Sequence, residues 1–219
     1  MNWSGRGPRI SLQALATQFS VRRVVVGFHI SWVAFSGITP DAGLSRLGLR
    51  RVGRQAGYAT EPFTGSVLPN GWFLVVADRD IESPIISTSS LGGLSEAAEV
   101  IACSVAEGVM ASTAEFWRDG HRMWSLSHDA QTSARHLESS GALPSGYQDV
   151  LAQETARQDS EDPDGGEVDF FFDIPLAVAR TIAGFKHDEK NPGLDDEGFD
   201  VFEWIHPPAP RRRWWQFWK

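Results

Sequence analysis

Three consecutive strand-like segments, separated by short turns, constrain the fold more than any other feature of this sequence. The segments are Val100–Ala106, Val109–Trp117 and His121–Ser127, and they are rich in β-branched, aromatic and small residues. Asp119-Gly120 between the second and third suits a two-residue hairpin, because both residues tolerate a positive φ. Glu107-Gly108 separates the first two. The pattern predicts an antiparallel meander.

Two more strands and one helix are predicted upstream of the meander. His29–Gly37 and Trp72–Ala77 are apolar runs beside turn-forming residues. Thr39 before Pro40 predicts the start of a short helix, with Thr39 as the N-cap. Residues 53–68 and 79–93 contain many turn-forming residues and are predicted to be loops.

Downstream of the meander the sequence becomes helical and acidic. Tyr147–Gln158 is predicted to be one helix, and Asp159–Glu167 a charged linker. Asp173-Ile174-Pro175 predicts the start of a second helix, whose apolar residues fall on one face. Gly184 is predicted to end it.

These elements predict an α+β fold: an antiparallel sheet of four to five strands, with two to four helices mainly on one face. The predicted organisation is a disordered basic extension over residues 1–28, a domain over residues 29–187, and a tail over residues 188–219 that is acidic, then Pro-rich, then rich in Arg and Trp. Arg22-Arg23 followed by the apolar Val24–Phe35 leaves a secretory signal as an alternative for the N-terminal segment. His29 interrupts that run, however, and no clear cleavage site follows.

Charge is distributed very unevenly along the 219 residues, which carry a net charge of −8. Residues 32–206 hold all 28 acids but only 12 of the 20 basic residues, which gives a net charge of −16. Such a body repels phosphate backbones, so no nucleic-acid partner is expected. The negative charge favours a partner protein with a basic surface, although the acidic residues could instead serve only to keep the protein soluble. The lone Cys103 and the lack of a membrane-spanning apolar run predict a cytoplasmic protein.

No sequence motif for catalysis, metal or cofactor binding stands out, and no cofactor is expected. His128 beside Asp129 is the one catalytic pair considered, with the histidine as a base in a hydrolase-like enzyme. A strand-terminal pair of this kind more often forms a structural hydrogen bond. Cys103 has no Cys or His at zinc-ligand spacing, and is predicted to pack in the core. A binding protein is therefore favoured over an enzyme.

Two surfaces are candidates for binding. Tryptophan and arginine are common at protein interfaces, and they gather with a histidine around the Asp119-Gly120 hairpin. This predicted patch consists of Trp117, Arg118, His121, Arg122 and Trp124. A packed core is the alternative for its aromatic members. The C-terminal tail could contact a membrane surface or a partner. Its residues are Arg211, Arg212, Arg213, Trp214, Trp215, Phe217 and Trp218.

Three segments together resemble small bacterial cytosolic α/β proteins of immunity-protein character. They are Trp32–Gly37, Pro69–Trp72 and Phe116–Asp129. The resemblance implies a protein-binding module, which could inhibit a basic bacterial toxin, and it carries over no catalytic residue. The alternatives are the His128–Asp129 enzyme and a membrane-peripheral adaptor that uses the tail.

Overall fold

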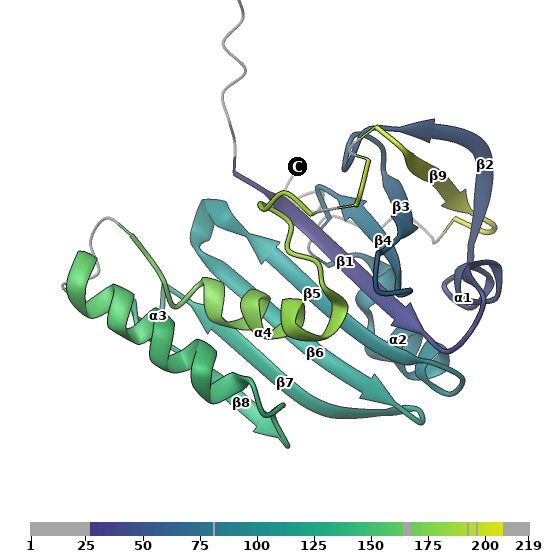
Figure 1. Ribbon diagram of the computed structural model, residues 1–219. Helices are drawn as coiled ribbons and strands as arrows, with labels where there is room; N and C mark the ends of the chain where they lie inside the picture. Colours follow the sequence, from purple (N-terminus) through teal and green to yellow (C-terminus); the bar gives the residue numbers. More distant parts are fainter. Residues whose placement is uncertain (1–26, 81, 164–167, 192, 196, 208–219) are drawn as a thin grey trace, which may run out of the picture.

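A nine-stranded sheet, antiparallel throughout, forms the centre of the molecule in the computed structural model (Figure 1). The model describes residues 27–80, 82–163, 168–191, 193–195 and 197–207. The strand order is β2-β9-β3-β4-β1-β5-β6-β7-β8. The α+β class is confirmed, but the predicted sheet of four to five strands is too small. The strands are β1 His29–Ser36, β2 Leu49–Ala56, β3 Phe63–Val67, β4 Phe73–Asp78, β5 Glu99–Ala106, β6 Ala111–Arg118, β7 His121–Asp129, β8 Glu138–Gly141 and β9 Phe199–Trp204.

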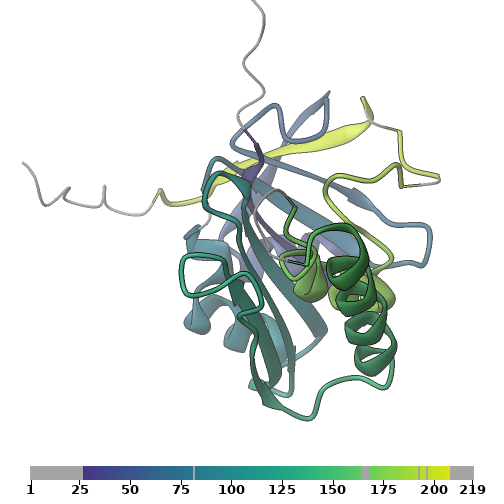
Figure 2. The same cartoon turned by 90° about the vertical axis from the view of Figure 1, so that its left-hand side faces the viewer.

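Helices cover both faces of the sheet, as Figures 1 and 2 show together. Helices α1 and α2 pack on one face, and α3 and α4 on the other. The prediction of helices mainly on one face is therefore wrong. The helices are α1 Pro40–Arg46, α2 Thr88–Ser95, α3 Tyr147–Glu161 and α4 Asp173–Ala183, with short 3-10 turns at η1 Pro84–Ile86 and η2 Glu107–Val109.

The central strand β1 explains why both faces need a cover. Trp32 and Ala34 point into the core beneath α4, whereas Val33 and Phe35 point into the core beneath α1 and α2. All four side chains are almost completely buried. A strand that is apolar on both faces is stable only when each face is packed against another layer.

The predicted meander is confirmed, since β5 pairs with β6 and β6 with β7. Asp119 and Gly120 both have positive φ, 53° and 76°, and join paired Arg118 and His121 in a two-residue hairpin. The preceding connection differs from the prediction. It is the 3-10 turn η2, followed by left-handed Met110, so β6 starts two residues later than predicted.

Helix caps also follow the sequence. The Thr39 hydroxyl accepts a hydrogen bond from the Ala42 amide at 3.3 Å, which caps α1. Gly184 ends α4 with φ 73°, a conformation that suits glycine.

Both predicted loops contain regular structure. Residues 53–68 include the second half of β2 and all of β3, and residues 79–93 include η1 and most of α2. Strand β2 lies at the sheet edge and is exposed along most of its length, so it lacks the alternation that marks a half-buried strand. Helix α2 contains two glycines, which hide a helical pattern.

Strand β9 changes the predicted domain boundary. It pairs with both β2 and β3, inside the sheet rather than in a tail. The domain therefore continues past residue 187, the boundary predicted from the acidic composition. Residues 1–26 and 208–219 lie outside the described part, and with them most of the predicted N-terminal extension and all the named tail residues. Among the described residues, no helix has the length and apolar character needed to cross a membrane.

Candidate functional site

The two tryptophans of the predicted hairpin patch are core residues. Trp117 is 5% exposed and packs with α1 and α2, whereas Trp124 is 3% exposed and packs on the α4 side. A register shift in the β6–β7 pairing lies between Phe116 and Trp117. The aromatic half of the predicted patch is thus not at the surface, and the core alternative holds for both tryptophans.

The two arginines of that patch are exposed but already paired. Arg118 forms an ion pair with Glu99 on β5. Arg122 lies 2.7 Å from Glu115, whose other carboxylate oxygen accepts from Trp117 Nε1 at 2.9 Å. His121 is exposed at the hairpin tip. The hairpin therefore presents arginines whose charge neighbouring carboxylates balance.

His128 does not form the predicted pair with Asp129. Its side chain is fully buried, with Nδ1 2.7 Å from the His136 carbonyl oxygen and Nε2 2.8 Å from Asp169 Oδ2. Asp129 instead contacts His136, because its amide donates to His136 Nδ1 at 2.9 Å. The proposed His128–Asp129 catalytic pair is therefore wrong.

The protonation of His128 follows from its partners. A carbonyl and a carboxylate both accept hydrogen bonds, so these partners favour the imidazolium form, in which both ring nitrogens donate. Burial alone would lower the pKa of His128. The hydrogen bonds to Asp169 and His136 and the charges of Asp169 and Asp129 outweigh it, and the pKa is raised. A ring with no free nitrogen cannot act as a base, so this is a structural tie.

A pocket of about 400 Å³ lies between α3 and α4. It combines three carboxylates and three cationic side chains with a few apolar and neutral groups. Its walls are Val150, Gln153, Glu154, Arg157, Asp173, Ala177, Arg180, Thr181, Lys186 and Glu189. This volume falls within the range of small-molecule sites, and the pocket is the candidate site of the described residues.

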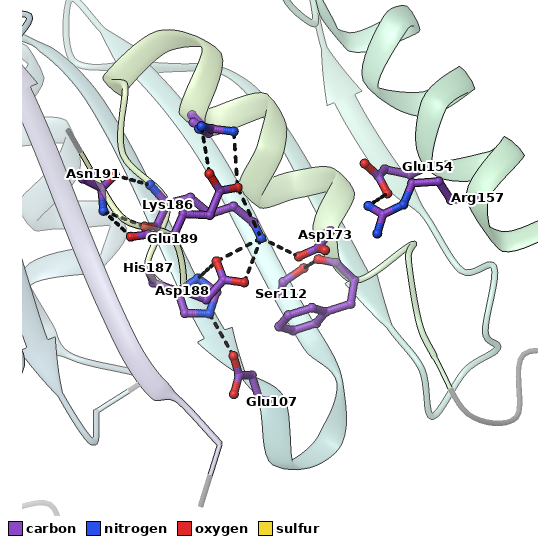
Figure 3. Close-up of polar contacts among 12 residues, drawn as sticks. Glu107, Ser112, Glu154, Arg157, Asp173, Lys186, His187, Asp188, Glu189 and Asn191 are labelled. Carbon is purple, nitrogen blue, oxygen red and sulfur yellow. Dashed lines mark hydrogen bonds and ion pairs between the residues drawn. The ribbon is translucent and has the colours of Figure 1, made fainter. Parts of the chain in front are cut away.

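Lys186 is the buried cation at this pocket (Figure 3). Its Nζ lies 3.0 Å from Asp173 Oδ1 and 2.9 Å from Asp188 Oδ1, with a more distant contact of 3.9 Å to Glu189. Burial alone would lower the pKa of Lys186, but the charge of Asp173 and hydrogen bonds to Asp188 and Asp173 raise it. The ammonium therefore stays charged and holds the start of α4 to the segment that follows it.

Glu154 contributes the most buried carboxylate of the pocket wall. Its side chain is 7% exposed and accepts a hydrogen bond from Arg157 Nη1 at 2.8 Å. The Arg157 guanidinium in turn lies 4.2 Å from the centre of the Phe170 ring. Burial raises the pKa of Glu154, with a further contribution from the charge of Asp173, although Arg157 and Lys186 oppose the shift.

Arg180 and Glu189 form the outer pair of the pocket. Two nitrogens of Arg180 contact two oxygens of Glu189, at 3.2 Å and 2.8 Å. Sequence reasoning missed this whole site, because its residues come from α3, α4 and the segment after α4. The available signal was Lys186-His187-Asp188-Glu189 directly after the predicted helix end at Gly184. Four adjacent ionisable residues there could have indicated a polar cluster.

A second feature is the balance of charges over residues 32–206. All ten arginines of residues 32–206 lie within ion-pair distance of a carboxylate, as do the ring nitrogens of three histidines. The same segment carries 28 acids, so carboxylates far outnumber the cations they balance. The arginines therefore leave little positive surface in this part of the chain.

The remaining candidates are accounted for by packing. Cys103 is 1% exposed, as predicted for a core residue, and burial raises the pKa of its thiol. Among the described residues, no group of three or more His, Cys, Asp or Glu side chains is arranged to hold a metal ion.

Comparisons of the chain with protein-family models, with curated proteins and with solved structures find no significant match.

Proposed function

We propose that this protein is a binding module for a partner protein with a basic surface, of the kind that inhibits a basic toxin. The observation that carries the proposal is the surplus of carboxylates over residues 32–206, with every arginine of that segment already paired. Such a field attracts a cationic partner, raises its association rate and repels anions.

The C-terminal end of α3 supports the proposal. Asp159 and Glu161 stand in or next to its last turn, and their side chains are 59% and 58% exposed. Each contacts one arginine, Asp159 with Arg135 and Glu161 with Arg157, and exposed ion pairs of this kind contribute only about 0.2–1 kcal/mol. A partner's lysine or arginine can therefore compete for both carboxylates, so this end is a candidate contact.

The experiment is a capture from native-cell lysate at about 50 mM and about 300 mM salt, followed by mass spectrometry. The proposal expects one specific basic protein that is retained at low salt and lost at high salt. Co-expression with the captured protein should then relieve its toxicity. A captured partner indifferent to salt, or one that is acidic, contradicts the proposal.

A matched pair of variants locates the contact on α3. Asp159→Asn with Glu161→Gln should weaken the complex about tenfold, because two attractive charges are removed. Asp149→Asn is the control, since Asp149 is exposed in the first turn of the same helix. Equal affinities of the two variants would exclude the C-terminal end of α3 as the contact.

A further inference from the structure

We propose that the pocket between α3 and α4 binds a small zwitterion with one ammonium and one carboxylate group, the class to which free amino acids belong. This site is independent of the partner surface proposed above. It is defined by buried charged groups on its walls rather than by the overall field of the domain.

The charge balance of the pocket differs from that of the rest of the domain. Its walls carry three carboxylates and three cations, so it is formally neutral, whereas residues 32–206 carry a net charge of −16. The three carboxylates are Glu154, Asp173 and Glu189, and the three cations are Arg157, Arg180 and Lys186. A neutral wall in an acidic domain does not select a plain cation.

Each wall cation already has a carboxylate partner. An anion would compete with these carboxylates for the arginines, and a cation would compete with the arginines for the carboxylates. A zwitterion instead offers a new partner to each member of an ion pair, and its binding leaves the net charge unchanged. A wall made of paired carboxylates and cations therefore favours a ligand that carries both charges.

Glu154 is the group that would hold the ammonium. Its side chain is 7% exposed, and Arg157 Nη1 at 2.8 Å is the hydrogen-bond donor that it has among the described residues. Lys186 does not bind the ligand's carboxylate, because Asp173 and Asp188 already occupy its ammonium at 3.0 Å and 2.9 Å. It fixes the pocket wall instead (Figure 3).

Arg180 is the group that would hold the ligand carboxylate. Its side chain is 50% exposed, and because an exposed ion pair contributes little, the ligand's carboxylate can replace that of Glu189. A guanidinium binds a carboxylate with two parallel hydrogen bonds. Val150 and Ala177 add apolar surface from the two facing helices. A ligand with a small aliphatic side chain therefore matches the wall.

Leucine tests the proposal against two analogues that each lack one charge, leucinamide without the carboxylate and isocaproate without the ammonium. Isothermal titration of the full chain should give a Kd for leucine of about 1 mM or tighter, and binding at least about tenfold weaker for either analogue. No leucine binding at about 10 mM, or equal binding of one analogue, overturns the proposal.

Three variants extend the test. Glu154→Gln and Arg180→Gln should each weaken leucine binding at least about tenfold, since each removes one charged contact. Asp149→Asn is the control, because Asp149 is exposed on α3 but does not line the pocket, and its affinity should equal that of the wild type. Thermal unfolding shows that each variant is folded. Wild-type affinity in folded Glu154→Gln and Arg180→Gln would overturn the site.

Discussion

Two buried cations lie near the start of α4, but they differ in access. His128 binds Asp169, four residues before the helix. Lys186 comes from the segment after the helix and binds Asp173 in the first turn and Asp188 beyond the last. Both cations connect the helix to neighbouring segments through carboxylates, and the pKa of each is raised.

The difference lies in what else each cation borders. The His128 side chain is fully buried, and both of its nitrogens are occupied. Lys186 is also saturated, yet it forms part of the wall of a pocket with half-exposed arginines. A buried charge network therefore indicates a ligand site only where some of its members remain free to rearrange. The sequence offered His128 as the chemical candidate, whereas the pocket lies along α4 beside the Lys186 ion pairs.

Replacing Lys186 should give the largest effect on stability. Lys186→Met leaves Asp173 and Asp188 close together without their cation, and removing one member of a buried ion pair typically costs about 3 kcal/mol. Urea unfolding should show a lower midpoint with an unchanged slope. Adding Asp173→Asn to Lys186→Met should recover part of the loss. A change below about 1 kcal/mol would show that the network contributes little.

Replacing His128 should have a smaller effect that depends on pH. His128→Leu removes two charge-assisted hydrogen bonds, with an expected loss of about 2 kcal/mol near pH 6. Because the folded pKa of His128 is raised, the contribution of its charge is complete below about pH 6.5, the usual value, and is lost as pH rises through the folded pKa. Urea midpoints across this range should converge with the wild type at high pH. A constant difference would contradict an imidazolium.

Ser112 connects the sheet to the start of α4, and its loss should cost less. The hydroxyl donates to the Phe172 carbonyl oxygen at 2.7 Å in a buried setting. Ser112→Ala should lower the free energy of unfolding by about 1 kcal/mol. Ser125→Ala is the control, since Ser125 pairs with Ser140 in an exposed contact. Equal effects of the two substitutions would show that burial does not govern this bond.

The smallest effect is expected at the hairpin. Arg118→Gln removes an ion pair with Glu99 in which both side chains are more than 40% exposed. Exposed pairs contribute about 0.2–1 kcal/mol, so a shift below about 0.5 kcal/mol is expected by thermal unfolding. A loss comparable to that of Lys186→Met would mean that the exposed pair contributes as much as the buried network.

The sequence predicted those parts of the fold whose signals are local. The Asp119-Gly120 turn, the Thr39 cap and the Gly184 end each depend on neighbouring residues, and all are present. Strand β9 was missed because its register depends on β2 and β3, which lie well over a hundred residues earlier in the chain. The packing of helices on both faces of the sheet was missed because it depends on the strand order, which local signals do not specify.

The candidate site could not be predicted from short stretches of sequence for a similar reason. Glu154 and Asp173 come from two helices whose facing surfaces are set by tertiary packing, and neither residue belongs to a motif. The surface prediction for Trp117 and Trp124 was wrong because tryptophan is common both at protein interfaces and in protein cores. The alternation of strand faces placed them in opposite cores, and no composition argument could choose between the two roles.

An amide chemical-shift titration with leucine compares the surroundings of the two cations most directly. The account predicts shifts that saturate around Glu154, Ala177 and Thr181, while His128 and its surroundings remain unchanged. Shifts centred on His128, or none at either place, would contradict the assignment of the pocket as the open site and of buried His128 as a closed structural tie.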